Sequence, residues 1–551
     1  MSTRTGLSTL FAFVLATAAG AQLAQPGRPA SARHPQLLAL DVPYVVLPSP
    51  DVARLMREDE ERGNWPGRYG AVIPSGFSCD DAGRWDESPA GELVWRLRLV
   101  SPGARSLGML LDRYELPASG ELFVRGGSGN VLGAFTRATR QPNGMLAVQP
   151  VLGDELTLEY VQDAGDPGRP ELRVGEVIHD YRGILDHIAL GSTIALGGGG
   201  CLVDVNCPAG AGYQDIKRSV LFVLFSGSYC SAGMINNTAE DQTPYFLTAN
   251  HCGNMTNVVA VFGYENTACG PGGASQANSI SGATLLAAST RYDSQLYRLS
   301  SAPPASFQPF YAGWDRAMNQ PAPGISISHP SGAPKKIARD NDKPIQNGTK
   351  WQVTWEIGKL MPGSSGSPLF SGVKRVIGPA CCVSDFNCDQ WANYGRLGGF
   401  WDQRLLGQWL DPLGANPTGI DGFDPFQGQA FVYNGGGTNP VVYASTTPPT
   451  VGTTWNAAID ASSQPAATST WIVCHRLPSA GVFLAWGEVL VDTSTNQIFL
   501  SAAPVAAGMS LHSNPIPNKA SLIGRTVYTQ GVILGSSGLL RLTNGVELRM
   551  R

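Results

Sequence analysis

Alternation of apolar and polar residues marks the N-terminal third of the chain. Val94–Leu99 and Glu121–Arg125 show this alternation, and Glu155–Tyr160 does so in part. A period of two is typical of a strand with one buried face. Turn-forming segments such as Ser101-Pro102-Gly103 separate these runs. The pattern predicts an antiparallel β-domain over residues 22–195, and this domain has no cluster of titratable residues suited to catalysis.

Residues 196–424 carry a different pattern, in which short apolar runs are punctuated by Gly, Ser and Asn. Val220–Phe225 and Tyr245–Leu247 are examples. One helix-like segment, Asp402–Leu410, comes near the end of this region. Many short strands followed by a single helix predict a closed β-barrel architecture.

Residues 425–551 read as a third unit of short strands between turns. Asn434–Pro440 is rich in Gly and Asn and predicts a linker, while Val482–Trp486 and Ile498–Leu500 predict strands. Charged residues are sparse here, which favours a compact β-sandwich. The chain contains no convincing internal repeat.

Length and composition agree with three domains. The chain has 551 residues, of which 43% are hydrophobic and 15% charged, enough apolar material for several cores. The 66 Gly and 40 Pro favour turn-rich β-domains over helical bundles. A formal net charge of -4 is not the electrostatic footprint of a nucleic-acid binder.

The N-terminus has the features of a secretory signal peptide. Arg4 supplies a positive charge, Leu10–Ala19 an apolar run, and Ala19-Gly20-Ala21 a small-residue cleavage site. The alternative is a buried N-terminal helix, which the order of these features disfavours. We therefore expect residues 1–21 to be removed. No later stretch is long and apolar enough to span a membrane, so we expect the remainder to be exported. The product would be a secreted, extracellular or periplasmic monomer.

Cysteines are concentrated in the middle region. An even number in one segment of an exported protein predicts disulfides. A zinc site is disfavoured, since the region has no C-x-x-C and only two histidines, and we expect no metal or other cofactor. Cys79 and Cys474 stand alone and are expected to be buried thiols. The eight clustered cysteines are Cys201, Cys207, Cys230, Cys252, Cys269, Cys381, Cys382 and Cys388.

Candidate chemistry begins with Pro362–Leu369, a Gly- and Ser-rich segment. Peptide hydrolysis needs a nucleophile, a base and donors for the developing oxyanion. Ser365 can serve as the nucleophile, and the N–H groups of Gly363 and Ser365 as the oxyanion donors. Gly366 leaves space beyond the nucleophile. A flexible surface loop is the plain alternative for such a segment.

His251 is the candidate general base. It ends Phe246-Leu-Thr-Ala-Asn-His251, an apolar strand running into the histidine, and Cys252 follows directly. A disulfide at Cys252 would hold the backbone beside the imidazole. The other histidine of the region, His329, lies in a Pro- and Gly-containing segment where we expect a structural role.

An acid is needed to orient the base and to stabilise the imidazolium. Asp293 begins an alternating strand, which suits a partly buried carboxylate, although a simple turn residue remains the alternative. Asp340 and Asp342 lie in a polar loop and are expected to be solvated, and Asp315 is the other aspartate between His251 and Ser365. The order His, Asp, Ser is that of peptidases with the chymotrypsin fold.

Several motifs together resemble the bacterial lysyl endopeptidases, a secreted branch of the trypsin-like serine peptidases. The resemblance covers nearly all of residues 196–424. It implies an all-β protein with a chymotrypsin-like double β-barrel and a C-terminal helix, and the triad His251, Asp293 and Ser365. The motifs include Cys201–Cys207, Phe246–Gly253, Ala312–Arg316, Ile327–Pro330, Gly363–Leu369, Tyr394–Arg396 and Trp409–Pro412.

The resemblance also implies three disulfides. Cys207 would pair with Cys269, Cys230 with Cys252, and Cys201 with a cysteine near Tyr394, most simply Cys388. Cys381 and Cys382 are then an extra pair relative to the family. Adjacent cysteines rarely bond to each other, because disulfide geometry is hard to meet there, and their connectivity stays open.

The flanking regions extend this comparison. Residues 22–195 resemble the propeptide of such enzymes, notably at Trp95-Arg-Leu, Ser101–Leu107 and Tyr181–Gly183. This implies a zymogen cleaved near residues 195–200, with the propeptide acting as inhibitor or chaperone of a peptidase whose other partners are protein or peptide substrates. The C-terminal module resembles, more loosely, modules appended to secreted bacterial proteins.

The chain departs from the family at the specificity pocket. Lysine-specific members carry an Asp two residues before the Tyr of Tyr-Gly-Arg, where this chain has Ala392. Asp385 and Asp389 in the preceding loop could replace that carboxylate, although a loop aspartate is usually solvated. No Lys or Arg lies between Arg182 and Lys217, so cleavage before Cys201 would follow a small or apolar residue. We therefore expect that Lys is not required at the cleavage site.

Two other functions are compatible with parts of the sequence. A catalytically silent secreted adhesion or carbohydrate-binding protein would explain the large C-terminal module, but the triad candidates and the oxyanion segment are intact. An esterase with the same triad is disfavoured, since the strand–Ser–helix G-x-S-x-G elbow is absent.

Overall fold

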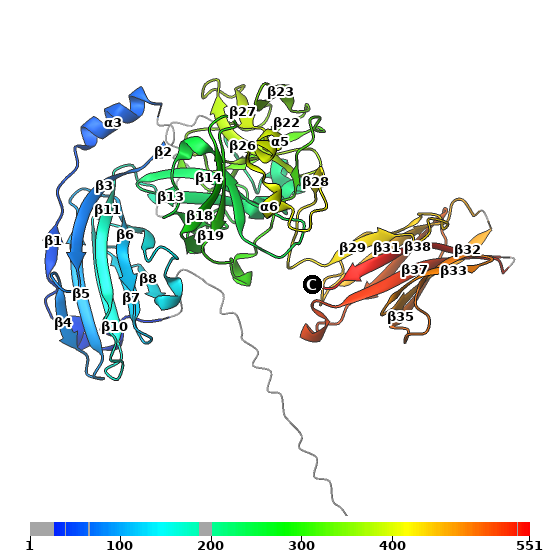
Figure 1. The fold of residues 1–551 in the computed structure, drawn as a ribbon, viewed down its shortest axis with the longest axis horizontal. Helices are drawn as coiled ribbons and strands as arrows, with labels where there is room; N and C mark the ends of the chain where they lie inside the picture. The colour runs from blue at the N-terminus through cyan, green and yellow to red at the C-terminus, as the bar shows by residue number, and fades with distance from the viewer. Residues whose placement is uncertain (1–26, 39, 64–66, 187–200, 465, 537) are drawn as a thin grey trace, which may run out of the picture. The chain divides into compact units, whose positions relative to one another are not determined.

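The computed structural model describes residues 27–38, 40–63, 67–186, 201–464, 466–536 and 538–551. The chain divides into two compact units, Met1–Phe423 and Asp424–Arg551 (Figure 1). The predicted signal peptide and the predicted propeptide cleavage region lie outside the described residues. No helix in the described residues is long and apolar enough to cross a membrane.

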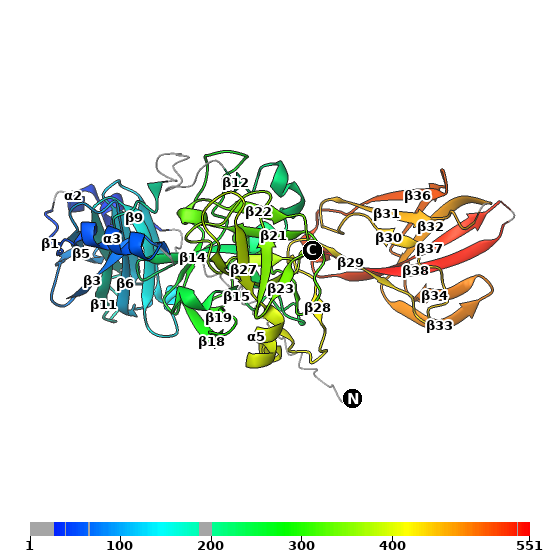
Figure 2. The same cartoon turned by 90° about the horizontal axis from the view of Figure 1, so that it is seen from above.

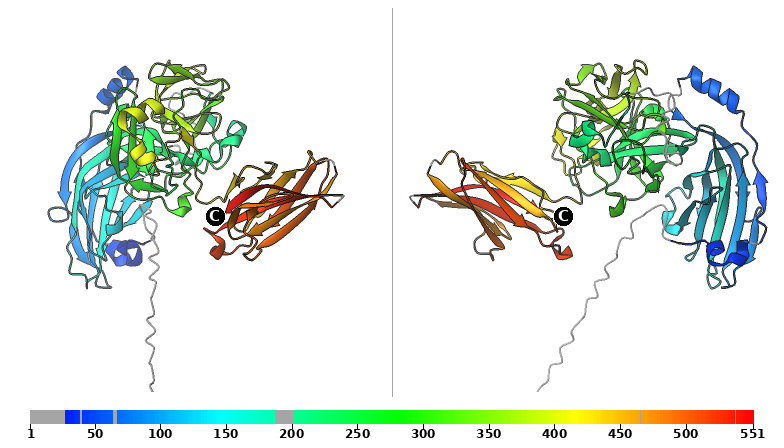
Figure 3. Two further views of the ribbon diagram at one scale, coloured as in Figure 1. Left: turned by 45° about the vertical axis from the view of Figure 1, so that its right-hand side comes forward. Right: turned by 180° about the vertical axis from the view of Figure 1, so that it is seen from behind.

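The N-terminal region, residues 27–186, is a β-sandwich (Figures 1 and 3). One sheet has the strand order β1 (Tyr44–Val46), β5 (Leu93–Val100), β10 (Glu155–Gln162), β7 (Glu121–Gly126) and β8 (Val131–Phe135), with β4 (Arg84–Glu87) paired to β5. The other has the order β3 (Gly70–Ser78), β11 (Glu171–Asp180), β6 (Ser106–Glu115) and β9 (Leu146–Leu152).

The two sheets of this region share one core, to which Leu97, Leu99, Met109 and Leu111 contribute. The three alternating runs of the sequence fall in β5, β7 and β10, so these strand predictions are confirmed. Helices lie outside the sandwich, and α3 is capped by the Asp51 carboxylate, which accepts the Arg54 N–H at 2.9 Å. The helices are α1 (Ala30–Arg33), α2 (Pro35–Leu38) and α3 (Val52–Glu61).

Residues 201–423 form two β-barrels, each wrapped around its own core. The first has the order β17 (Ser279–Ser281), β16 (Val259–Val261), β13 (Val220–Phe225), β14 (Ser228–Ile235), β15 (Tyr245–Thr248), β19 (Ser294–Leu299) and β18 (Ala283–Ser289), and β2 (Gly67–Arg68) pairs with β14. The second has the order β12 (Val203–Asp204), β22 (Lys336–Asp340), β21 (Gly324–Ser328), β25 (Pro368–Phe370), β26 (Val376–Val383), β27 (Trp391–Gly395), β24 (Lys350–Thr354) and β23 (Ile345–Asn347), with β20 (Trp314–Asp315) and β28 (Gly419–Ile420) beside β26.

A third apolar cluster joins the two barrels and includes Ile235 and Leu296 from the first and Ile325 and Phe370 from the second. This is the chymotrypsin-like double β-barrel that the resemblance implied. The all-β fold class is confirmed.

The run Val220–Phe225 explains how the N-terminal region meets the first barrel. All six residues of β13 are buried, although an alternating pattern is the norm for a barrel strand. Leu221 and Val223 face the barrel core. Phe222 and Leu224 face outward, into a cluster that also contains residues of the N-terminal region. The strand is apolar on both faces because both faces are covered.

The single helix expected over Asp402–Leu410 is wrong. The structure has α5 (Leu397–Arg404) and α6 (Gly407–Leu410) instead. Leu405 adopts a left-handed conformation with φ of 52°, which ends α5 and cannot occur inside a helix. Trp401 of α5 packs on Trp314, with ring centroids 4.6 Å apart, which anchors the helix to the second barrel.

The C-terminal unit is a β-sandwich with its own core, as expected (Figure 2). One sheet has the order β29 (Gln429–Tyr433), β38 (Leu540–Arg549), β37 (Thr526–Gly535), β32 (Ala467–His475) and β35 (Phe499–Pro504). The other contains β30 (Tyr443–Ser445), β31 (Thr454–Asp460) and β36 (Met509–Pro515), and β33 (Pro478–Leu484) and β34 (Gly487–Val491) form a hairpin.

Asn434–Pro440 is not a linker between units. It connects β29 to β30 inside the C-terminal unit, and the buried side chain of Asn439 donates to the Glu488 carbonyl at 2.8 Å. Gly and Asn are used here for a tight connection, and composition alone does not distinguish that from a flexible one.

The disulfides of the double barrel follow the pairing that the resemblance implied: Cys201–Cys388, Cys207–Cys269 and Cys230–Cys252. Cys381 and Cys382, left open by the sequence, are bonded to each other. Cys79 and Cys474 are free and buried.

Candidate active site

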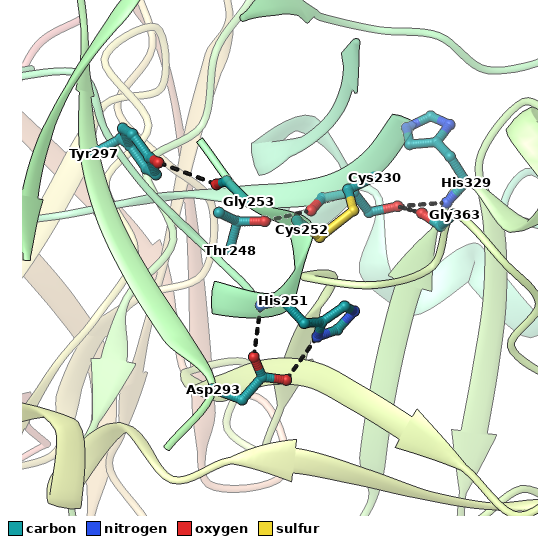
Figure 4. Close-up of a disulfide and its surroundings, with 10 residues drawn as sticks. Cys230, Thr248, His251, Cys252, Gly253, Asp293, Tyr297, His329 and Gly363 are labelled. Carbon is teal, nitrogen blue, oxygen red and sulfur yellow. Dashed lines mark hydrogen bonds and ion pairs between the residues drawn. A yellow bond between two sulfur atoms is a disulfide. The ribbon is translucent and has the colours of Figure 1, made fainter. Parts of the chain in front are cut away.

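His251 lies in a short 3-10 turn, η4 (Asn250–Cys252), directly after β15. Strand β15 is held between β14 and β19, so the turn starts from a fixed point of the first barrel. The Cys230–Cys252 disulfide ties the same turn to β14 (Figure 4). The backbone of His251 is therefore held on both sides, by β15 before it and by the disulfide after it.

Asp293 holds His251 through two hydrogen bonds. Its Oδ2 lies 2.7 Å from Nδ1 of the imidazole, and its Oδ1 accepts the His251 backbone N–H at 2.8 Å (Figure 4). With the carboxylate on Nδ1, the proton of neutral His251 is assigned to that nitrogen, which leaves the lone pair on Nε2. Burial raises the pKa of Asp293, but the hydrogen bonds and charge of His251 outweigh it and hold that pKa below its ordinary value.

The backbone at Asp293 is strained. The residue closes a turn with φ of 48° immediately before β19 rather than lying in the strand. A positive φ is uncommon for any residue other than Gly and is tolerated best by Asn and Asp. The local conformation points the carboxylate back toward η4, which an extended residue at the strand start would not do.

Ser365 lies at the tip of a loop that precedes β25, and its side chain is fully buried. Two hydrogen bonds from Ser231 hold the loop: the Ser231 N–H donates to the Ser365 carbonyl and the Ser231 hydroxyl to the Gly363 carbonyl, both at 2.8 Å. The Gly366 N–H donates to the Ala380 carbonyl of β26 at 2.9 Å. The loop is thereby fixed to strands of both barrels.

The Ser365 loop packs against the segment that carries His251. A Cβ on Gly366 would lie 2.1 Å from the Thr248 hydroxyl and 2.9 Å from the Ala249 nitrogen. Only Gly permits this approach, and its φ of 80° also favours Gly. The Ser365 hydroxyl has no hydrogen-bond partner among the described residues. The bond from nucleophile to base is often long in resting structures and tightens with substrate.

Gly363 and Ser365 are the residues whose N–H groups the sequence predicted as oxyanion donors. Their carbonyls are engaged by Ser231, whereas within the described part of the chain neither N–H donates a hydrogen bond. Gly363 has φ of 92°, a left-handed conformation that favours Gly. Unengaged backbone N–H groups are the kind of donor that an oxyanion site needs.

The other His and Asp candidates lie elsewhere. His329 is fully buried, stacks on Tyr264 and donates its Nδ1–H to the Ala333 carbonyl at 2.9 Å, and burial lowers its pKa to about 3. This agrees with the expected structural role. Asp340 was expected to be solvated, and this expectation is wrong. Its side chain is buried and accepts the Thr354 N–H at 2.8 Å. Asp342 is exposed.

The predicted pocket residues separate into one buried and two exposed positions. Ala392 is fully buried on β27, opposite Val383 of β26. Asp385 and Asp389 are exposed, and Asp385 accepts the N–H of Asn387 in its own loop at 2.7 Å. Both loop carboxylates are exposed, whereas Ala392 is fully buried.

Ser231 is the site residue that sequence reasoning missed. It follows Cys230 in an ordinary strand and contacts a loop more than a hundred positions away, so no local signal marks it.

Asp340, Asp342 and Glu356 are the described carboxylates whose oxygens cluster within 4.8 Å. Two of the three are exposed, and such groups are common on protein surfaces without an ion.

Residues 197–391 match the family model described as lysyl endopeptidase, C-terminal domain. The resemblance is thereby confirmed for this segment, which is a peptidase domain. Solved structures give weaker likenesses. The serine endoprotease from Yersinia pestis has 9% identity over 55% of this chain and 95% of its own, with a TM-score of 0.26. The Rv3671c protease from M. tuberculosis has 15% identity over 36% and 84%, with a TM-score of 0.25. Likenesses of this size carry no weight for the chain's chemistry.

Proposed function

We propose that the peptidase domain is a serine endopeptidase in which Ser365 is the nucleophile, His251 the general base and Asp293 the residue that orients the base. The observation that carries this proposal is the double hydrogen bond from His251 to Asp293. A carboxylate that accepts both the ring N–H and the backbone N–H of one histidine fixes the rotation of the ring and its tautomer.

The geometry supports a mechanism through an acyl-enzyme. Nε2 of His251 takes the Ser365 hydroxyl proton as Oγ attacks the peptide carbonyl. The oxyanion that forms is stabilised by the N–H groups of Gly363 and Ser365. The imidazolium, stabilised by ionised Asp293, then gives its proton to the leaving amine. Water repeats the sequence against the acyl-enzyme and releases the second product.

A fluorophosphonate probe tests this function, because it reacts only with an activated serine. The full chain is expressed and its secreted product is labelled alongside Ser365→Ala and a matched control, Ser306→Ala, which removes an exposed hydroxyl of the same domain. Labelling of the native protein and of the control but not of Ser365→Ala is expected. A folded product that takes up no probe would favour the silent adhesion or carbohydrate-binding protein instead.

The N-terminal region supports a zymogen organisation. Strand β2 extends the first barrel by pairing with β14, at Arg68 with Ser228 and Gly67 with Tyr229. Further contacts join the region to the same barrel: the Ser279 hydroxyl donates to Gln149 at 2.7 Å. We propose that residues 22–195 are a propeptide that guides folding of the barrel and restrains the enzyme until the connecting segment is cleaved.

The covered face of β13 refines this proposal. Phe222 and Leu224 pack against Tyr69, Ile178 and Ile184 of the N-terminal region. Release of that region would expose these side chains to water, at about 25 cal/mol for each Å² of apolar surface. The cleaved N-terminal region should therefore stay bound and co-elute with the barrel in size-exclusion chromatography at micromolar concentration. Separate elution of the two pieces would contradict this.

We propose that the protein is secreted and monomeric. Four disulfides in the double barrel favour an oxidising compartment. The signal-peptide prediction agrees with that. The test is the N-terminal sequence and mass of the product in the culture medium. A product retained inside the cell with residues 1–21 attached would contradict the proposal.

A further inference from the structure

The segment leading to the oxyanion loop carries a buried lysine. Lys359 is only 5% exposed, and its Nζ donates to the Phe386 carbonyl at 2.7 Å. An ammonium group has three donors and is strongly hydrated in water. The hydrogen bond to one carbonyl replaces only part of the hydration that the ammonium loses on burial.

A comparison within the protein shows what is missing around Lys359. The other buried lysine of the domain, Lys335, pairs with the Glu265 carboxylate, and Lys217 pairs with the same group. Lys359 forms no ion pair with any residue that the structure describes. A buried cation without a carboxylate is costly to a fold, and an anionic ligand supplies the missing partner.

Lys359 lies on the segment that leads to Ser365. It stands six residues before Ser365, the spacing at which trypsin carries the acid of its specificity pocket. The side-chain amide of Gln390 accepts the Leu360 N–H at 2.7 Å and donates to the Leu360 carbonyl at 3.1 Å. These bonds clamp the segment of Lys359 to the loop that contains Phe386.

The loop that contains Phe386 offers no buried carboxylate to the ammonium. Ala392 replaces the family's carboxylate, and the Asp385 and Asp389 side chains of the intervening loop are exposed. Leu360, the neighbour of Lys359, and Ala392 belong to one apolar cluster, so a buried lysine lies in the region where the family carries an acid. A cationic substrate side chain would meet Lys359 as a like charge.

We propose that Lys359 determines specificity by pairing its ammonium with the carboxylate of Glu or Asp on the acyl side of the bond that is cut. The inference rests on the proposed serine peptidase function. It identifies the substrate class as peptides and proteins with accessible acidic residues, and it agrees with the expectation that Lys is not required at the cleavage site.

The test compares fluorogenic peptides that differ only in the residue before the cut: Glu, Gln, Asp or Lys. Glu and Gln have the same shape and differ in charge, so their ratio of kcat/KM isolates the electrostatic contribution. For the secreted product of the full chain we expect Glu to exceed Gln by about 100-fold, with Lys the poorest. Lys359→Gln should reduce the ratio of Glu to Gln to about threefold or less, and Lys359→Arg should retain most of it.

Two measurements separate this inference from its foundation. Fluorophosphonate labelling reports the triad without a substrate side chain, so Lys359→Gln should still be labelled. The exposed Lys343→Gln is the matched control and should leave every ratio unchanged. A labelled enzyme that cuts Gln as well as Glu, or whose ratio survives Lys359→Gln, overturns the role of Lys359 and leaves the triad standing. Absence of labelling in the native protein overturns both.

Discussion

Asp293→Asn tests the orientation of the base with minimal change in shape. In the native protein Oδ1 and Oδ2 accept from two N–H groups of His251, at 2.8 and 2.7 Å. An amide has one acceptor and one donor, so it cannot serve both. If its oxygen stays on the backbone N–H, its NH₂ faces Nδ1 and selects the tautomer with the proton on Nε2. That tautomer cannot take the Ser365 proton.

The expected loss follows from that tautomer. The equivalent change in the chymotrypsin-fold template lowers kcat about 10⁴-fold, which is about 5 kcal/mol of transition-state stabilisation. The opposite amide orientation offers no escape, since its NH₂ would then face the backbone N–H, a contact between two donors. Folding should be little affected because the side-chain volume is unchanged.

The assay is kcat/KM at neutral pH on a fluorogenic peptide that the native enzyme cuts, together with the rate of fluorophosphonate labelling. Asp342→Asn, which alters an exposed carboxylate of the same domain, is the matched control. Both rates should fall together in Asp293→Asn and stay unchanged in the control. Activity within tenfold of the native enzyme, at unchanged thermal stability, would refute the role assigned to Asp293.

Three further predictions concern the scaffold of the site. Burial lowers the pKa of His329 to about 3, while the unfolded chain binds that proton near pH 6.5. Stability from neutral His329 is therefore present above about pH 6.5 and lost as the pH falls toward 3, by on the order of 3–5 kcal/mol. His329→Gln should flatten the dependence of Tm on pH across that window, and an unchanged slope would contradict it. Ser231→Ala removes the hydroxyl that donates to the Gly363 carbonyl. We expect kcat to fall about tenfold with KM unchanged, a smaller loss than removal of an oxyanion donor causes. A change in KM alone would argue against this role of Ser231. Replacing Cys230 and Cys252 by Ala opens a loop with a sequence separation of 22. The free energy of unfolding, measured by chemical denaturation, should fall by about 3 kcal/mol. A denaturation midpoint equal to that of the native protein would exclude this contribution.

The triad candidates were accessible from the sequence because few alternatives existed. With two histidines in the region, the one between a strand and a cysteine was the better base, and His329 proved to be packed against Tyr264. Asp293 was harder, since it was expected at the start of a strand. Its place in a strained turn, with φ of 48°, depends on its bonds to His251 and has no sequence signature.

The helix and the linker show where sequence patterns fail. Asp402–Leu410 has helical spacing, yet Leu405 turns left-handed and divides it. Asn434–Pro440 has the composition of a linker but is a tight internal connection. In both places a tertiary contact outweighed a local preference worth less than about 1 kcal/mol per residue.

The sequence by itself determined the strands, the histidine that precedes Cys252 and the Gly-rich serine segment, because residue type and short spacing carry that information. Only the tertiary structure decided what those groups face. The Ser231 hydroxyl and the Gly363 carbonyl are 132 positions apart, and the acid expected from Asp385 or Asp389 points to solvent while Lys359 is buried. The physical reason is that burial and charge pairing are properties of surroundings assembled from distant segments, so the charge that a pocket offers is settled only when those segments pack.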